Sequence, residues 1–457
     1  MLRRWTLRRA ESGAGEAGAL PLAASVEYST EAIPHGELPG IEPVAEAVEQ
    51  RPGARRKRVT KKRIALAVLV LLVIAMGFAY SRKDEFSAQA ADFSRNVIGD
   101  ENTARVESWY FRIKDKTDQV KYKLFGGTTN PFDENKVVVQ LVPRSPARTV
   151  LIDLSAAPSL TSLAIPNLFK PRPLELPKTT PLRDQLEQGE GVWTTSGLPR
   201  TNPDDILMAK TFIRPDKTRP YALVGVLLLD SRRIRLSITG GTVDPGGDRG
   251  VKGPGVIPQA DQKNLLLAWN GGFKGPHGGF GMVADGKEYR PLRAGLATIA
   301  VYKDGSIKMG EWGRDLNPDE NIVAARQNAV LLVDHGEVSK RTSEGNDTWG
   351  YVQVNSSDFI TWRSAVGLTK DGNLIVAAGN SLSAESLAKA LWAAGAYTAM
   401  QLDINSPYVL TSAFFPQPDG SLKAERFMDT MPDSPSRWFK QQERDFMYVT
   451  IDESRFR

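Results

Sequence analysis

A glycine-rich segment is the part of this sequence with the clearest capacity for chemistry. Residues 271–281 contain six glycines, beginning with Gly271 and Gly272, and they follow an apolar run that ends in Asn270. Glycine lets the backbone approach a ligand closely, so that successive N–H groups can bind an anion. His277 lies within the segment and is a candidate for acid–base catalysis or phosphate binding. The alternative is an ordinary surface loop, because turns also favour glycine.

Two arginines precede apolar runs and are candidates for holding an anionic substrate. Arg363 precedes the run 365–368, and Arg326 with its neighbour Gln327 precedes the run 330–333. The guanidinium group binds phosphate or carboxylate through a fork of donors. The alternative for either arginine is an ion pair with an acid within the fold.

Asp403 ends the apolar run 399–402, and Asn405, a further candidate for substrate binding, follows two positions later. The segment before the run, Ser383 to Gly395, has the pattern of a helix with a capping serine, an early acid and a terminating glycine. The order helix, strand and carboxylate places Asp403 beyond the carboxyl end of a strand. Ligands bind at this position in many folds built from sheets and helices.

The histidines do not form a metal-binding pattern. The chain has three of them, His35, His277 and His335, and no cysteine, and none of the spacings is that of a zinc site. A transition-metal cofactor is therefore not expected, whereas a requirement for a divalent cation is left open. His335 has the setting of a turn residue, and the segment 244–250 reads as a cation-binding loop or, more simply, as a long turn.

The elements that must position these residues are short strands. After Arg183, apolar runs alternate with Gly, Pro and Asp-Gly, and Asp-Gly pairs at 285, 304, 371 and 419 predict hairpin turns. The predicted strands are 222–229, 234–239, 265–269, 298–302, 330–333, 365–368, 374–377, 399–402 and 448–451. The predicted fold class is α+β, a strand-rich mixed-sheet domain over residues 185–457 with few helices, preceded by a single transmembrane helix and a disordered tail.

The charge distribution bears on partners and location. Residues 51–63 hold eight positive charges and no acid, so the other 444 residues carry a net charge of −2 within the formal total of +6. A nucleic-acid partner is not expected, because the basic excess is one block and not a folded face. The uncharged run 64–80 follows and predicts a transmembrane helix, with a buried core helix or a cleaved signal peptide as alternatives. The positive-inside rule places residues 1–63 in the cytoplasm and the C-terminal domain outside, attached to the cell membrane.

Two regions connect this span to the C-terminal domain. Residues 81–140 are charged with scattered aromatic side chains and predict a membrane-proximal helical stalk. Residues 141–184 contain eight prolines and predict an extended linker. The predicted organisation is therefore a tail (1–63), a span (64–80), a stalk, a linker and one large domain.

Taken together, the ordered motifs resemble the phosphodiester glycosidase family and its bacterial branch associated with exopolysaccharide. The similar stretches are Trp269-Asn-Gly-Gly-Phe273, Arg363-Ser-Ala-Val-Gly367 with the hairpin after it, and Gln401-Leu-Asp403. The resemblance implies that Asn270, Arg363 and Asp403 match the family's asparagine, arginine and aspartate. The chain departs from the family's Leu-Asp-Gly-Gly pattern, because it reads Leu-Asp-Ile-Asn.

The resemblance implies a hydrolase that cleaves the bond between a sugar's anomeric carbon and a phosphate diester in an envelope polysaccharide or glycoconjugate. Arg363 and the loop amides would hold the phosphate, Asn270 would orient a substrate oxygen, and Asp403 would act as an acid–base group or stabilise an oxocarbenium-like sugar. His277 is a second proton donor. The alternative is a non-catalytic envelope protein that binds a polysaccharide or tethers an assembly with the same fold.

Overall fold

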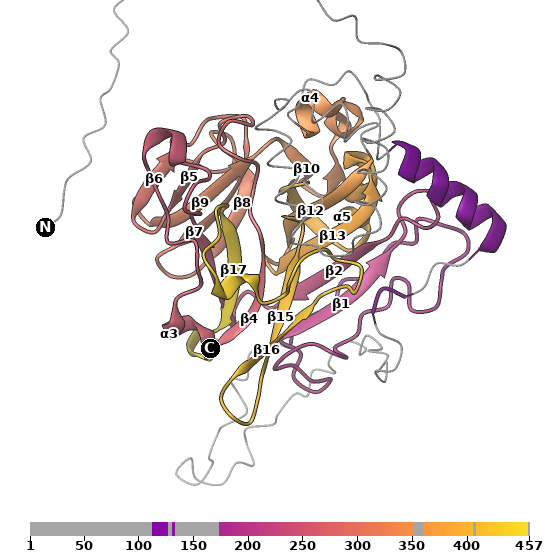
Figure 1. The fold of residues 1–457 in the computed structure, drawn as a ribbon, viewed down its shortest axis with the longest axis horizontal. Coiled ribbons are helices and arrows are strands. Elements are labelled where there is room, and N and C mark those ends of the chain that lie inside the picture. The colour runs from indigo at the N-terminus through magenta and orange to yellow at the C-terminus, as the bar shows by residue number, and fades with distance from the viewer. Residues whose placement is uncertain (1–111, 127–129, 133–172, 351–359, 405–407, 456–457) are drawn as a thin grey trace, which may run out of the picture. The chain divides into compact units, whose positions relative to one another are not determined.

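The computed structural model describes residues 112–126, 130–132, 173–350, 360–404 and 408–455 (Figure 1). All of them belong to one compact unit, residues 69–457. The predicted tail, the run 64–80 and Asn405 lie outside the described residues.

Three antiparallel sheets form the domain. Sheet A has seven strands in the order β1 (Met208–Ile213), β2 (Val224–Leu229), β13 (Leu374–Leu382), β12 (Thr361–Thr369), β14 (Ala396–Gln401), β10 (Leu331–Asp334) and β11 (Glu337–Val338). Sheet B has five, in the order β16 (Leu422–Arg426), β15 (Thr411–Pro416), β4 (Leu265–Asn270), β17 (Phe446–Ile451) and β3 (Ile234–Thr239). Sheet C has five, in the order β6 (Lys287–Arg290), β5 (Met282–Ala284), β9 (Ile322–Asn328), β7 (Ala297–Tyr302) and β8 (Ile307–Glu311).

The described helices are few and short. Beyond the helix at residues 112–125, they are α3 (Gln259–Gln262), α4 (Asn346–Trp349), α5 (Ala384–Ala393) and the 3₁₀ turns Gly247–Arg249, Lys340–Ser343, Arg437–Phe439 and Glu453–Arg455. In α5, Ser383 accepts a hydrogen bond from the Ser386 amide and completes a capping box, and Gly395 takes a φ of +93° just after the helix. The helix predicted from the sequence is confirmed with its caps.

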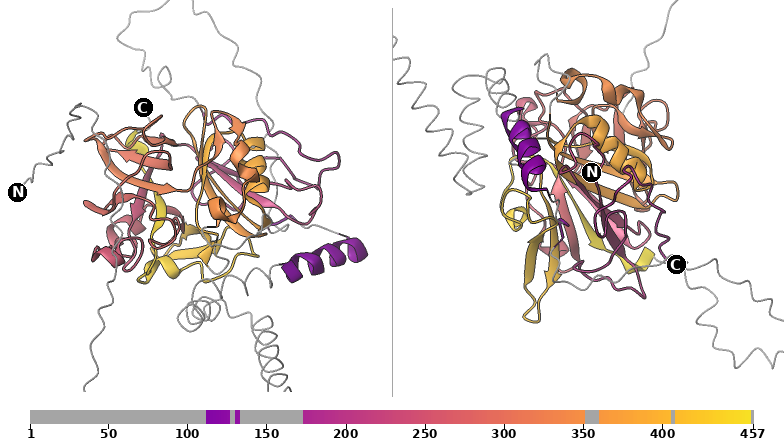
Figure 2. Two further views of the ribbon diagram at one scale, coloured as in Figure 1. Left: turned by 90° about the horizontal axis from the view of Figure 1, so that it is seen from above. Right: turned by 90° about the vertical axis from the view of Figure 1, so that its right-hand side faces the viewer.

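The middle strands of sheet A are buried on both faces, which explains why they are rich in apolar residues. Along β2, Val226 and Leu228 belong to the apolar cluster that α5 covers, whereas Leu227 and Leu229 belong to the cluster shared with sheet B. This alternation is the two-residue period of a strand. Figures 1 and 2 show α5 lying against the middle strands of sheet A.

The expected mixed sheet is wrong, because every pairing between the named strands is antiparallel. The chain passes from β13 through α5 to β14, but β12 lies between those two strands and runs antiparallel to both. The unit is therefore a split one, in which the parallel strands are not neighbours.

All nine predicted strands are present, and each Asp-Gly pair lies in a hairpin. The four hairpins join β5 to β6, β7 to β8, β12 to β13 and β15 to β16. The turn chemistry of Asp-Gly is local, which is why these predictions hold.

The predicted fold class is corrected in its membrane part. No helix within the described ranges is long and apolar enough to cross a membrane. The longest described helix, residues 112–125, has 14 residues, whereas a span takes about 20. The segment predicted to cross the membrane, residues 64–80, is not among the described residues.

Two segments before the sheets make defined contacts with them. Leu174 is buried in the cluster under α5, and the Thr180 amide donates to the Ala393 carbonyl oxygen at 2.8 Å. In the helix at 112–125, Asp115 accepts hydrogen bonds from Arg219 at 2.8 Å and from the Tyr221 hydroxyl at 2.6 Å. The boundaries of the stalk and linker stay predictions.

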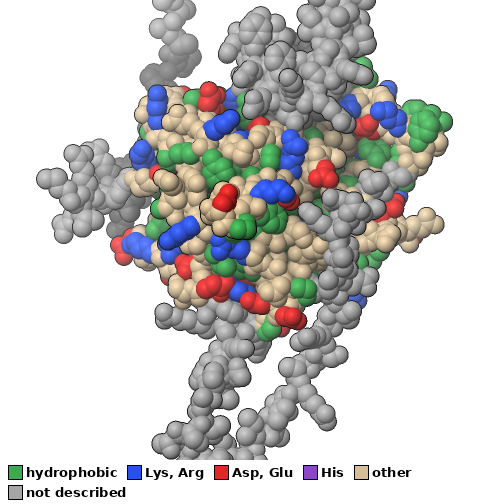
Figure 3. All heavy atoms as spheres, turned by 60° about the horizontal axis from the view of Figure 1, so that its bottom comes forward, with side chains coloured by type: hydrophobic (Ala, Val, Ile, Leu, Met, Phe, Trp, Pro, Cys, Tyr) green, Lys and Arg blue, Asp and Glu red, His purple; other side chains and the backbone are tan. Residues whose placement is uncertain are grey.

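On the face in Figure 3, basic and acidic side chains are interspersed, in keeping with the near-neutral charge outside residues 51–63.

Candidate functional site

Asn270 and Asp403, which lie far apart in the sequence, are joined by a short chain of hydrogen bonds. Asn270 ends β4, and its Nδ2 donates to Ser364 Oγ in β12 at 2.8 Å. Ser364 Oγ in turn donates to the Asp403 carbonyl oxygen at 2.8 Å, and the Asp403 amide donates to the Gly271 carbonyl oxygen at 2.9 Å. The structure therefore brings two of the predicted site residues together where sheets A and B meet.

The Asp403 carboxylate is held by two donors. Its Oδ1 accepts the Ile404 amide at 2.8 Å, and its Oδ2 accepts Arg444 Nη1 at 2.6 Å. Asp403 is only 4% exposed. The Arg444 guanidinium also lies over the Tyr408 ring, 3.3 Å from its centroid, so the partner of the carboxylate is itself fixed by a cation–π contact.

Ile404, where the chain departs from the Gly-Gly pattern, does not add bulk to an open surface. Its side chain is 6% exposed and belongs to the apolar cluster that also contains Phe273 and Phe280. The departure therefore places a core side chain directly after the carboxylate, which anchors the end of β14.

Arg363 lies on the other face of sheet A from Ser364, because neighbouring residues of a strand point to opposite sides. Its Nε donates to the Leu382 carbonyl oxygen at 3.0 Å and its Nη1 to the Trp349 carbonyl oxygen at 3.2 Å. Arg363 is 2% exposed, and burial lowers the pKa of its guanidinium to about 9. Its predicted contact with a phosphate stays a prediction.

Arg326 is fully buried and forms a two-pronged ion pair with Asp445. Its Nε lies 2.8 Å from Asp445 Oδ2 and its Nη2 lies 3.0 Å from Asp445 Oδ1. The neighbouring Gln327 is also fully buried, and its side chain exchanges hydrogen bonds of 2.8 and 2.9 Å with the backbone of Arg293. Arg326 and Gln327 lie within β9 and not in a segment before a strand, and their contacts connect β9 to the segments that hold Asp445 and Arg293.

The first two amides of the glycine-rich segment point at Asp445. The Gly271 N–H donates to the Asp445 carbonyl oxygen at 3.0 Å, and the Gly272 N–H donates to Asp445 Oδ2 at 3.1 Å. A Cβ atom on Gly271 would lie 2.0 Å from Asp445 Oδ2, so the close approach requires glycine. Half-buried His277 lies in the turn that follows, where its amide donates to the Lys274 carbonyl oxygen at 3.0 Å.

Sequence reasoning missed Arg444 and Asp445, the charged partners of the site. Both stand directly before the buried strand β17. A charged residue shortly before an apolar run was the signal that singled out Arg363 and Arg326. Applied to the run that begins at Phe446, the same signal identifies this pair.

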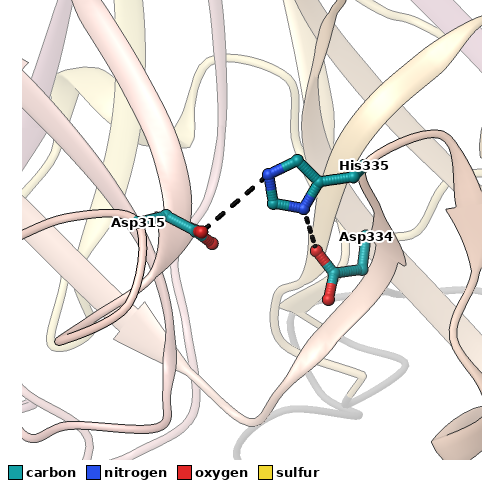
Figure 4. A group of neighbouring side chains, drawn as sticks. All are labelled: Asp315, Asp334 and His335. Atoms are coloured by element: carbon teal, nitrogen blue, oxygen red, sulfur yellow. Dashed lines mark hydrogen bonds and ion pairs between the residues drawn. The ribbon is translucent and has the colours of Figure 1, made fainter.

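One group of possible metal ligands occurs in the part of the chain that the structure describes: Asp315, Asp334 and His335 (Figure 4). His335 Nδ1 lies 2.7 Å from Asp334 Oδ1, and its Nε2 lies 3.8 Å from Asp315 Oδ1. Arg314 donates to both carboxylates at 2.7 Å, and its hydrogen bond lowers the pKa of Asp315. The guanidinium already supplies the positive charge here, so we interpret the group as an ion-pair network.

His335 itself is the turn residue that the sequence predicted. It has a φ of +50° and, with Gly336, forms the two-residue turn between β10 and β11.

Part of the chain that contains these residues is similar to a known protein family. Residues 263–403 match the model of the family described as phosphodiester glycosidase. No curated protein sequence matches the chain.

Solved structures similar to it include the following three, each with a TM-score below 0.5. The catalytic domain of zebrafish N-acetylglucosamine-1-phosphodiester alpha-N-acetylglucosaminidase, auto-inhibited by its pro-peptide, is 19% identical with a TM-score of 0.36, covering 56% of this chain and 87% of that one. A hypothetical protein from Synechocystis is 12% identical with a TM-score of 0.27, covering 50% and 59%. A putative exported protein from Burkholderia pseudomallei is 12% identical with a TM-score of 0.26, covering 50% and 74%.

The matched segment contains Asn270, Arg363 and Asp403. It ends at the carboxylate that Arg444 holds, and it begins just before β4. The match over residues 263–403 therefore confirms the resemblance to the phosphodiester glycosidase family that the motifs indicated, and it supports a hydrolase.

Proposed function

We propose that the domain hydrolyses the bond between the anomeric carbon of a sugar and the phosphate of a sugar-1-phosphate diester, in an envelope polysaccharide or glycoconjugate. The observation that carries the proposal is the Asp403–Arg444 pair, bonded through the Asp403 backbone to Ser364 and Gly271. The family match supports the reaction class. An extracytoplasmic location stays a prediction from the sequence.

The pair suits the charge changes of this reaction. Breaking the anomeric C–O bond leaves positive charge on the sugar and additional negative charge on the phosphate. In the proposal, Asp403 stabilises the oxocarbenium-like carbon, and the cationic Arg444 beside it interacts favourably with the departing phosphate. Opposite charges fixed 2.6 Å apart before the reaction need no reorganisation when the bond breaks.

The test is turnover by the full chain of a panel of sugar-1-phosphate diesters, with and without a chelator. We expect release of free sugar and a phosphate monoester by the wild type, and loss of that activity in Asp403→Asn. Asp371→Asn is the matched control, because Asp371 is an exposed aspartate in the turn between β12 and β13. Unchanged hydrolysis by Asp403→Asn would remove Asp403 from the mechanism.

A second candidate function is polysaccharide binding without catalysis. It is favoured by the internal hydrogen bonds of the motif residues, since both carboxylate oxygens of Asp403 accept donors from the protein and Asn270 bonds to Ser364 and Leu410. Saturable binding of a glycan panel, with no turnover of any diester, would support this function and reject the hydrolase.

A further inference from the structure

A second carboxyl group, that of Asp244, belongs to a loop that pairs with the residue before Arg444. The amides of Val243 and Asp244 both donate to the carbonyl oxygen of Glu443, at 3.0 and 2.8 Å. This pairing places Asp244 next to the residue that precedes Arg444. The loop reaches the site from a part of the sequence that lies outside the family match.

The carboxyl group of Asp244 uses one oxygen for the fold and leaves the other accessible. Its Oδ1 accepts the Gly275 amide of the glycine-rich segment at 3.1 Å. Its Oδ2 makes no hydrogen bond to any residue that the structure describes, and it is not among the fully buried atoms that lack a partner. Asp244 is 8% exposed, so a group reaching Oδ2 would enter a largely desolvated position.

The charged groups that act on Asp244 come from two elements. Lys274 belongs to the glycine-rich segment, and Arg444 and Asp445 precede β17. Burial raises the pKa of Asp244, and this effect outweighs the Gly275 hydrogen bond and the two cations, which favour the ionised form. Asp445 acts in the same direction as burial.

We propose that Asp244 is a further catalytic residue of the hydrolase, the acid that protonates the departing phosphate oxygen from its Oδ2. This inference rests on the proposed function. Asp403 would stabilise the positive charge on the sugar carbon, and Asp244 would protonate the leaving group, as in other glycosidases that use two carboxyl groups.

The step balances as a hydrolysis. The anomeric C–O bond breaks and its electron pair goes to the oxygen, which takes the proton of Asp244 and leaves as a phosphate monoester monoanion. Water then bonds to the anomeric carbon and returns a proton to the Asp244 carboxylate. The second proton of a phosphate monoester has a pKa of about 6, so without this proton the leaving group would depart as a dianion at neutral pH.

Asp244→Asn tests the assignment, because an amide oxygen can still accept the Gly275 hydrogen bond but the side chain cannot donate an acidic proton. We expect kcat to fall by about 100-fold or more on the best diester of the panel, with little change in KM. The basic limb of the wild-type pH profile should disappear in the variant. Asp248→Asn, a change at an exposed aspartate of the same loop, should keep both rate and profile.

The outcomes separate the two proposals. Suppose the wild type turns over the diester. If Asp244→Asn then keeps the wild-type kcat and the basic limb of the pH profile, or changes only KM, the role of Asp244 is overturned and the hydrolase proposal is unaffected. No turnover by the wild type overturns both. If the variant does not fold, the wild-type profile decides: a rate that falls on the basic side supports the acid, and a flat profile from about pH 4 to about pH 8 rejects it.

Discussion

Arg444 Nη1 lies 2.6 Å from Asp403 Oδ2, and this contact joins the segment after β14 in sheet A to the segment before β17 in sheet B. The side chains are 11% and 6% exposed, so the pair lies mostly out of water. It therefore connects two sheets at the predicted site residue Asp403.

We expect Arg444→Met to lower the free energy of unfolding by about 3 kcal/mol, because it leaves the Asp403 carboxylate buried without this partner. Hydrolysis should be lost as well. Arg235→Met is the matched control: that pair with Asp452 has a 65% exposed arginine, and its loss should cost about 0 to 1 kcal/mol. Urea denaturation measures both. Equally small losses of unfolding free energy in Arg444→Met and Arg235→Met would show that the Asp403–Arg444 pair is well solvated.

The buried pair of Arg326 and Asp445 predicts a non-additive result. Arg326→Met alone should cost about 3 to 5 kcal/mol, since the Asp445 carboxylate stays buried. Adding Asp445→Leu should recover part of that loss, because no charge is then left behind. Urea denaturation of both single variants and the double variant gives the coupling energy. A double variant as unstable as the sum of the two would contradict this interpretation.

Gly271→Ala tests the close approach of the glycine-rich segment to Asp445. The new Cβ would lie 2.0 Å from Asp445 Oδ2 and 2.5 Å from its Cγ, so the segment must shift, at a cost of about 1 to 3 kcal/mol or more. Gly345→Ala, where nothing lies within 4 Å, should change the free energy by about 0.5 kcal/mol or less. Thermal denaturation compares the two. A tolerated Gly271→Ala would mean that the segment is not tightly packed.

Asp244 predicts a pH dependence of stability with a defined sign. Its raised pKa means that the folded protein keeps a proton that the unfolded chain, with a pKa of about 3.9, has lost. The contribution of this group to stability therefore falls as the pH rises from about 3.9 to the raised folded value.

Asp244→Asn lacks this titration, so it should gain stability relative to the wild type over that range. Urea denaturation at about pH 3.5 and about pH 7 measures the difference, with Asp248→Asn as the control. Parallel stability curves for wild type and Asp244→Asn would contradict the raised pKa.

The elements of this fold were predictable where their signals are local. The Asp-Gly hairpins and the cap of α5 depend on residues within one turn of each other, and they are confirmed. The strands β1 and β9 were missed although they are regular, because each combines polar and apolar residues without a clean alternation. Their burial comes from neighbouring sheets that the sequence does not reveal.

The site was predictable only in part, because its contacts depend on sheet order and on which face a residue takes. Asn270 and Asp403 do come together. Arg363 could not be placed without knowing that β12 is buried on both faces, so that its neighbour Ser364 points toward Asn270 and Arg363 points away. The partner of Asp403 is 41 residues further along, a separation that no local pattern spans.

The position of β17 sets an order on the assembly of this protein. It is the last strand in the sequence, yet it lies between β4 and β3 within sheet B. A chain emerging from the ribosome therefore has two strand edges, those of β3 and β4, with an unfilled position between them until β17 is made, and such edges invite pairing with other chains. Arg444 directly precedes β17, so the guanidinium that pairs with Asp403 reaches the site only when β17 completes sheet B. A nascent chain that ends before this segment has neither the completed sheet nor the Asp403–Arg444 pair.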